Sequence, residues 1–273
     1  MKNKINPWIS ILIPSYEYPE GVLRILNLIY ISNEYNIECI VGDDSNSSFV
    51  ESMVKSHKLY SQGKVAFIKN KNNLGAVKNW NNLVNLARGE YILLMHHDEC
   101  PENTDFFYRL KELIKKSHKP DIIFLRCSLQ LLRNKRLRYH MPFFLQTLFL
   151  KHVPDYLILH NIIGSPSNVV VRKDLYLEFD EELVWTVDVD WMVRLLRKSK
   201  SNWIFGRHLS IMSMYNQATS ITTKLGSQIP FLRHNEIKKI QNKLGKLDVF
   251  YYIFPETWDK KLLSIFEKLC WIL

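Results

Sequence analysis

The 273-residue sequence contains only 9 glycines, and they do not form the loops that hold phosphates in many nucleotide-binding proteins. No GxGxxG follows the first predicted strand, and no GxxxxGK followed by Ser or Thr occurs anywhere. Both loops bind phosphate through backbone N–H groups. A standard dinucleotide-binding loop and a P-loop are therefore unsupported, and a bound diphosphate needs another source of positive charge.

Cysteine is also scarce. The four cysteines, Cys39, Cys100, Cys127 and Cys270, show no CxxC spacing. This pattern argues against a zinc site and against a disulfide framework. We expect reduced thiols in a cytoplasmic protein.

Long hydrophobic runs are missing as well. Residues 139–150 are apolar, and residues 156–171 are uncharged but interrupted by polar residues, glycine and proline. A helical membrane span needs roughly 20 predominantly apolar residues. We expect no membrane span, and we interpret the apolar stretch near the N-terminus as a strand and not as a signal peptide.

The remaining composition is that of a globular protein with a basic charge balance. Hydrophobic residues make up 47% and charged residues 23%, which is typical of a chain that buries a core. The 37 Lys and Arg exceed the 27 Asp and Glu by 10. This excess suggests an anionic partner: the phosphates of a nucleotide, a lipid surface or nucleic acid.

Apolar, β-branched runs alternate with segments of helical spacing in the first half of the chain. Residues 8–14, 37–42, 64–68, 91–95 and 121–125 read as buried strands, and residues 21–33 and 77–87 read as helices. This alternation predicts an α/β fold with a doubly wound, mostly parallel sheet and helices on both faces.

Polar and acidic residues follow four consecutive predicted strands. Residues 14–17, 43–47, 70–75 and 96–99 would all lie at the carboxyl ends of the strands, where open α/β sheets bind ligands. Asn, Asp and Ser also form ordinary turns. Turn formation does not require His96, His97, Asp98 and Glu99, however, so we favour a binding site.

Carboxylates in this last cluster could hold a divalent metal that neutralises a diphosphate. In extended geometry His96 and Asp98 point one way, and His97 and Glu99 the other. We expect Asp98 to be a ligand. His96 is either a ligand or a hydrogen-bonding partner of the loop, and His97 is more compatible with a structural role.

With these motifs in order, the sequence resembles the inverting GT-A glycosyltransferases of family 2. Residues 9–26, 40–48, 72–99, 164–175 and 179–196 match, and together they extend over most of residues 8–220. The resemblance implies a GT-A domain over residues 1–220. Its nucleotide-binding half would be 1–126 and its acceptor half 127–220, followed by a helical, aromatic extension over 221–273.

The resemblance also assigns roles to residues. The nucleotide-sugar-binding positions would be Pro14, Ser15, Tyr16, Asp43, Asp44, Asn73, Gly75, Lys78, Asn79, His96, His97 and Asp98. Asp98 matches the last acidic residue of the family's DxD metal motif, and His96 stands where the first Asp would be. A Mn²⁺ or Mg²⁺ held by Asp98, His96 and Glu99 is implied, with less negative charge than usual.

The predicted acceptor side centres on Asp188. The family pattern places the catalytic base there, with Arg194 six residues later. Asp188 and Asp190 are about 200° apart around a helix, so they cannot both face one substrate. Asp188 could instead be only a helix cap. The acceptor and helper positions would be Asp190, Arg194, Gly164 and Ser165.

The resemblance implies transfer of a sugar from a nucleotide-diphosphate sugar to a lipid-linked glycan, as in O-antigen or capsular polysaccharide synthesis. The aromatic C-terminal stretch could contact the inner face of the cell membrane, dock on the core or form a dimer surface. An alternative is a protein that binds the nucleotide sugar without transferring it. Nucleic-acid binding ranks last, because no recognisable RNA or DNA module occurs.

Overall fold

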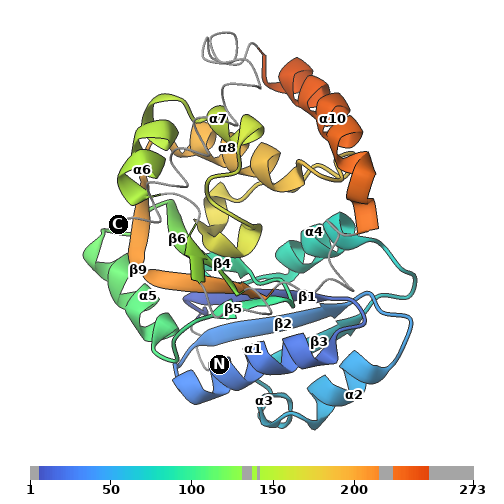
Figure 1. Cartoon of the computed structure of the whole chain (residues 1–273). Coiled ribbons are helices and arrows are strands. Elements are labelled where there is room, and N and C mark those ends of the chain that lie inside the picture. The colour runs from blue at the N-terminus through green and yellow to red at the C-terminus, as the bar shows by residue number, and fades with distance from the viewer. Residues whose placement is uncertain (1–5, 131–136, 140–141, 215–223, 246–273) are drawn as a thin grey trace.

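The computed structural model describes residues 6–130, 137–139, 142–214 and 224–245. Within these ranges, nine strands form one mixed sheet in the order β3-β2-β1-β4-β8-β6-β9-β5, with β7 paired to β6 (Figure 1). The strands are β1 (Ile9–Ser15), β2 (Ile37–Asp43), β3 (Val65–Lys69), β4 (Tyr91–Leu94), β5 (Glu99–Pro101), β6 (Ile122–Gln130), β7 (Leu137–Tyr139), β8 (Val169–Arg172) and β9 (Trp203–Met214).

The first half of the sheet is parallel, as predicted. β1 pairs in parallel with both β2 and β4, and β2 pairs in parallel with β3. The five predicted strands correspond to β1, β2, β3, β4 and β6, and the two predicted helices correspond to α1 (Pro19–Ser32) and α4 (Ala76–Leu86). The carboxyl ends of β1 to β4 therefore meet at one edge.

The second half of the sheet is mixed. β8 lies antiparallel between β4 and β6, β9 is parallel to β6, and β5 and β7 are antiparallel to their neighbours. The parallel pairs have the longer registers, so the sheet is mostly parallel as predicted. The antiparallel direction of β8 was not predicted, because an apolar run such as residues 169–171 indicates a buried strand but not its direction.

Helices cover both faces of the sheet and bury one hydrophobic cluster on each. Alternate residues of β1 divide between the two: Ile9, Ile11 and Ile13 pack with α1, and Leu12 packs on the other face. The remaining helices of the described chain are α2 (Phe49–Ser56), α3 (Lys58–Ser61), α5 (Phe106–Lys116), α6 (Phe143–His152), α7 (Tyr156–Leu159), α8 (Val187–Ser199) and α10 (Ile229–Leu244), with 3₁₀ turns η1 (Pro166–Asn168), η2 (Lys173–Leu175) and η3 (Gly226–Gln228).

The helix α10 begins after the predicted end of the GT-A domain, but it packs on that domain. Ile237 and Ile240 are buried in the same cluster as Val187 and Val189 of α8. The division into 1–126, 127–220 and 221–273 stays a prediction, and β6 continues across its first boundary. The aromatic stretch 246–273 lies outside the described residues. Among the helices that are described, none is long and apolar enough to cross a bilayer.

Candidate active site

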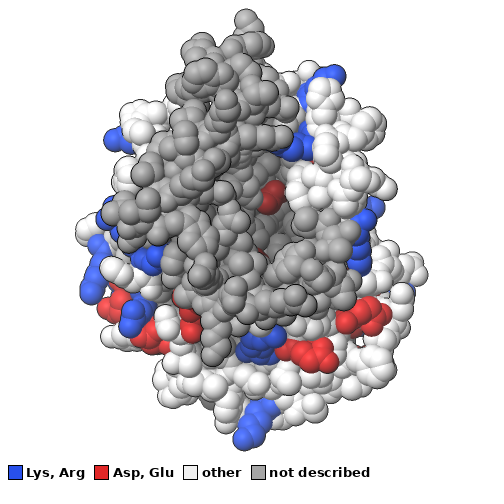
Figure 2. Space-filling model, viewed as in Figure 1, with Lys and Arg blue, Asp and Glu red and all other residues white. Residues whose placement is uncertain are grey.

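The loops that follow β1, β2 and β4 contact one another at the carboxyl edge of the sheet. Ser15 pairs with Asp43 in the β1–β2 register, and the backbone N–H of Asp44 donates to the Ser15 carbonyl at 2.9 Å. The backbone N–H of Tyr16 donates to Nδ1 of His97 at 3.2 Å. The structure thus brings the predicted nucleotide loops next to the His96–Glu99 cluster. Figure 2 shows an acidic side chain near the centre of the viewed face.

Asp43 is fully buried at the end of β2, and its carboxylate is neutralised by Lys69. Lys69 Nζ donates to Asp43 Oδ2 at 2.8 Å and to the carbonyls of Ser45 and Ser47. The other oxygen, Asp43 Oδ1, accepts from the Ser45 N–H at 3.0 Å and from the Ser45 hydroxyl. Asp43 therefore shapes the 43–47 loop as well as lying at the predicted base-binding position.

Asp44 fixes the loop that follows β3. Its Oδ1 accepts from the Leu74 N–H at 2.8 Å, and its Oδ2 accepts from the Gly75 N–H at 2.9 Å. The Asn73 side chain donates to the Asp44 carbonyl at 3.1 Å. Gly75 has a φ of 82°, a left-handed conformation that glycine adopts readily. Asp44 is thus hydrogen-bonded to the 73–75 loop directly beside Asp43.

The last two predicted nucleotide positions on this side differ in character. Asn79 is buried, donates to the Gly42 carbonyl at 3.0 Å and accepts from Asn70 at 3.1 Å. Asn79 thus holds the end of β2 through the Gly42 carbonyl. Lys78 is exposed on the first turn of α4, where its charge faces solvent. Pro14 is buried within β1, whereas Tyr16, two residues later, is exposed.

His96, Asp98 and Glu99 form a compact group of metal-ligand atoms. One ligand atom from each lies within 4.8 Å of the others. The extended geometry assumed above was wrong here, because the chain turns: the Glu99 N–H donates to the His96 carbonyl at 3.0 Å. Glu99 consequently lies alongside His96, with 3.4 Å between His96 Nδ1 and Glu99 Oε2.

Burial and charge perturb the three groups. Burial, with the Glu99 charge, raises the pKa of Asp98 to about 6. Burial opposes the charge of His96, but the neighbouring carboxylates outweigh it and raise the pKa of His96. Burial likewise opposes the charge of Glu99, yet the bonds from His96 and Ser165 lower its pKa. Two carboxylates this close together and this far from solvent favour a bound cation.

The residues present fit a divalent cation. His96 Nε2 is buried without a hydrogen-bond partner among the described residues, and its ring stacks on Trp80 with centroids 4.8 Å apart. One imidazole and two carboxylates suit Mn²⁺ better than Mg²⁺, which prefers oxygen ligands. His97 is occupied elsewhere: it accepts from Tyr16 and packs edge-on against Tyr18, and burial lowers its pKa to about 4.

Asp188 lies in the first turn of α8, partly buried. Its Oδ1 accepts from the Val189 N–H at 2.9 Å, and its Oδ2 accepts from the Asn161 side chain at 2.7 Å. Burial raises the pKa of Asp188 to about 6, against the opposing effect of these bonds and of the His96 charge. Asp188 and His96 are therefore close enough to influence each other electrostatically.

The loop 161–168 connects Asp188 to the metal-ligand group. Asn161 donates to Asp188 and also to the Gly164 carbonyl at 2.7 Å. Ser165 Oγ donates to Glu99 Oε2 at 2.6 Å, and Ser167 Oγ accepts from the His96 N–H at 2.9 Å. The predicted helper residues Gly164 and Ser165 thus lie between the two parts of the site.

Asp190 lies on the other side of α8 from Asp188, as the helical spacing predicted, and Arg194 pairs with it. Asp190 is fully buried, and its Oδ2 accepts from Arg194 Nε at 2.8 Å. Lys243 of α10 contacts both oxygens of Asp190, at 3.0 and 3.2 Å. These contacts describe an ion-pair cluster between α8 and α10. A role of Asp190 and Arg194 toward the acceptor stays a prediction.

Sequence reasoning missed three residues of this region: Lys69, Asn161 and Lys224. Lys224 Nζ lies 5.5 Å from the centroid of the Tyr16 ring, which places a cation beside the predicted nucleotide loop. None of the three belongs to a recognisable motif, and each meets its partner only through the fold. Each comes from a segment far from its partner along the chain; the separation is 26 residues for Lys69 and Asp43 and 27 residues for Asn161 and Asp188.

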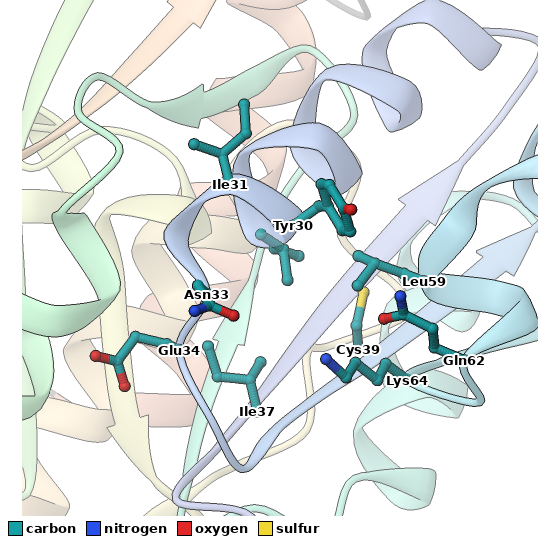
Figure 3. A pocket seen from close by; sticks show the side chains of 10 residues that line it. Tyr30, Ile31, Asn33, Glu34, Ile37, Cys39, Leu59, Gln62 and Lys64 are labelled. Atoms are coloured by element: carbon teal, nitrogen blue, oxygen red, sulfur yellow. The ribbon is translucent and has the colours of Figure 1, made fainter.

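A separate hollow of about 400 Å³ lies at the opposite edge of the sheet (Figure 3). It is lined by the end of α1, the start of β2 and the turn before β3, including Tyr30, Cys39 and Lys64. Because these are the amino ends of the strands, this hollow does not belong to the site at their carboxyl ends.

Comparison with known proteins is consistent with this geometry. Residues 10–178 match the family model of Glycosyl transferase family 2, which is more than half of the chain, so the chain belongs to that family. The match ends before Asp188, and the assignment thus depends on the nucleotide-binding side and on loop 161–168.

Relatives agree with the family, and solved structures agree with the fold. The chain is 26% identical over 196 residues to an uncharacterized glycosyltransferase of Methanocaldococcus jannaschii, with 70% of this chain and 65% of the relative covered. It is 21% identical over 242 residues to one of Haemophilus influenzae, with 85% and 78% covered. The fold resembles S. aureus TarS residues 1–349 in complex with UDP-GlcNAc, at a TM-score of 0.68 and 16% identity, over 94% of this chain and 71% of that one.

This chain spans less than two thirds of two of its matches. It covers 65% of the M. jannaschii protein and 42% of the longer S. aureus TarS structure, which it resembles at a TM-score of 0.63. At identities of 15–16% the TarS likeness shows a shared GT-A fold.

Proposed function

We propose that this protein transfers a sugar from a nucleoside-diphosphate sugar to an acceptor hydroxyl, with inversion at the anomeric carbon and Asp188 as general base. The observation that carries the proposal is loop 161–168. It hydrogen-bonds to Asp188 through Asn161 and to Glu99 through Ser165. A base for the acceptor and a cation-binding group for the donor are thereby held by one short segment.

The state of Asp188 supports its role. A carboxyl with a pKa of about 6 is mostly ionised at pH 7 and above, yet it is basic enough to take a proton from a hydroxyl during attack. The acceptor oxygen bonds to the anomeric carbon as its proton passes to Asp188. The bond from that carbon to the phosphate oxygen breaks, and the nucleoside diphosphate leaves. One displacement from the opposite face inverts the configuration without a covalent enzyme intermediate.

The leaving diphosphate needs positive charge. His96, Asp98 and Glu99 would hold Mn²⁺ or Mg²⁺, and such a cation, when bound, neutralises charge on the diphosphate. The chain itself offers Lys224 beside Tyr16 and Lys78 on the first turn of α4. These lysines would attract the donor phosphates to the same edge of the sheet.

The structural likeness to TarS favours a uridine nucleotide as donor, since TarS was solved with UDP-GlcNAc and with UDP. We expect UDP to raise the melting temperature more than GDP, CDP or dTDP, and Mn²⁺ to enlarge the shift. A larger shift with another nucleotide would assign the donor to that base, and equal shifts for all four would contradict a nucleobase pocket at Asp43.

For the acceptor we propose a lipid-linked glycan of the O-antigen or capsular type, reached from the cytoplasmic face of the membrane. Helix α6 supports membrane contact, because Phe144 and Leu148 are 69% and 54% exposed, one turn apart, near Lys151. The net charge of +10 favours anionic head groups. Co-sedimentation with anionic vesicles tests this contact: Phe144→Ser should weaken it, and an unchanged bound fraction would exclude α6.

The transfer itself is tested with Asp188→Asn. We expect this variant to lose turnover of the donor while its nucleotide-induced thermal shift persists, because Asn keeps the shape but cannot accept a proton. Asp174→Asn, at a carboxylate 67% exposed, is the matched control. If the wild-type protein binds nucleotide sugar with no transfer to any acceptor, the alternative of a binding protein holds. If Asp188→Asn remains active, another group is the base.

A further inference from the structure

The residues that lead into α8, directly before the turn that carries Asp188, are bound by a carboxylate from outside that helix. Thr186 stands at the N-cap but makes no side-chain hydrogen bond to the helix. Its hydroxyl donates instead to Glu236 Oε2 of α10, at 2.7 Å. The N-cap side chain of α8 is thus bound by a residue 50 positions away and not by its own helix.

Glu236 accepts hydrogen bonds from the backbone N–H groups of the residues that precede α8. Its Oε1 accepts from the Val184 N–H at 2.8 Å, and its Oε2 accepts from the Trp185 and Thr186 N–H groups at 3.0 and 2.8 Å. Glu236 is only 4% exposed. A buried carboxylate with this many charge-assisted hydrogen bonds has one orientation, and it transmits that orientation to the segment it holds.

Further contacts fix α10 against the same region. Lys243 contacts Asp190 and Asp180, and Arg197 donates to the Leu244 carbonyl at 2.9 Å. At the other end, Arg233 donates to the carbonyl of Leu159, two residues before Asn161. Helix α10 lies at the edge of the layer that contains α7 and α8 (Figure 1). It therefore contacts both backbone segments from which Asp188 and its partner Asn161 extend.

We propose that Glu236 is a positioning residue for the Asp188 base, acting through residues 184–186 and the first turn of α8. The inference rests on the proposed function. Helix α10 would then support the catalytic base, although it begins beyond residue 220, the predicted end of the GT-A domain. A displacement of about 1 Å can prevent a base from reaching the proton that it removes. Loss of Glu236 should therefore slow the chemical step more than it weakens donor binding.

The test compares Glu236→Gln with Glu182→Gln. Glu182 lies in the same region, carries an 80% exposed side chain, and meets Lys239 at 3.6 Å. In Glu236→Gln an amide group replaces one oxygen and faces backbone donors. We expect kcat to fall about tenfold to a hundredfold, while the donor KM stays within about twofold. Glu182→Gln should match the wild-type protein in both.

A second readout needs no turnover. With ¹³C-labelled aspartate, the carboxyl of Asp188 is assigned by comparison with Asp188→Asn and titrated in each variant. We expect the Asp188 midpoint to fall in Glu236→Gln, because a loosened first turn admits water to a carboxyl whose pKa is raised by burial. If Glu236→Gln folds poorly, Thr186→Val removes a single donor to Glu236 and should give a smaller change of the same kind.

The two readouts separate the two hypotheses. A normal kcat and an unchanged Asp188 midpoint in Glu236→Gln, with only a lower melting temperature, would overturn the positioning role and leave a structural one. Absence of sugar transfer in the wild-type protein would overturn the proposed function instead. The titration would then still report whether Glu236 controls Asp188.

Discussion

Asn161 provides the sharpest prediction about the base. Its side chain donates to Asp188 Oδ2 at 2.7 Å, a bond that stabilises the ionised carboxyl and so lowers its pKa. In Asn161→Ala this bond is lost, and the pKa of Asp188 should rise. A hydrogen bond to a charged group stabilises that group by about 1.5–3 kcal/mol, and about 1.4 kcal/mol corresponds to a shift of one pKa unit. We therefore expect the pKa to move from about 6 to roughly 7–8.

The assay is the pH dependence of kcat at saturating donor. Because only ionised Asp188 accepts the proton, kcat of the wild-type protein should fall below pH 6, about tenfold for each pH unit. In Asn161→Ala this decline should begin about one to two units higher, so that activity at pH 7 drops while activity at pH 9 is largely kept.

Asn82→Ala is the matched control, since Asn82 is exposed on α4. Its profile should overlay that of the wild-type protein. An acidic limb that stays in place in Asn161→Ala, or moves to lower pH, would refute the assignment of this limb to Asp188.

Three further perturbations follow from the contacts described above. Asp98→Asn should abolish the Mn²⁺-dependent part of the nucleotide thermal shift while keeping the metal-independent part; an intact Mn²⁺ response would show that the ion binds elsewhere. Lys69→Met should lower the free energy of unfolding by roughly 3 kcal/mol in urea, because it leaves the fully buried Asp43 charge without its partner, whereas the exposed Lys71→Met should have little effect. Gly164→Ala should lose about 1–3 kcal/mol and much of the activity, since φ is 118° and the new Cβ would lie 2.5 Å from Asn168 Oδ1. Gly63→Ala, strained but uncrowded, should lose less stability and keep kcat.

Local sequence pattern predicted the parts of the fold that depend on neighbours along the chain. The buried strands and amphipathic helices of the first half follow from periodicity, because one strand or helix face must be apolar wherever it packs. The site edge followed from topology, since parallel strands such as β1 and β2 end together. Asp188 was identified through the family resemblance, and its placement beside Asn161 supports that prediction without testing it.

What could not be predicted depends on contacts between distant segments. Glu99 reaches His96 only because the chain turns after β4, and no residue type marks that turn unambiguously. The Lys69–Asp43 pair and the Glu236 cap of α8 join residues 26 and about 50 positions apart. Such pairs are specified by the three-dimensional packing of β3 and α10, which periodicity along the chain does not encode.

The proposed function requires that one edge of the sheet hold the nucleotide, the cation and the base together. The most direct measurement is a crystal structure of Asp188→Asn with Mn²⁺ and the nucleotide sugar whose nucleotide gives the largest thermal shift. We predict the nucleobase at Asp43 and Tyr16, the diphosphate at His96, Asp98 and Glu99, and the anomeric carbon facing residue 188. A nucleotide bound in the hollow at the opposite edge, or a sugar turned away from residue 188, would contradict it.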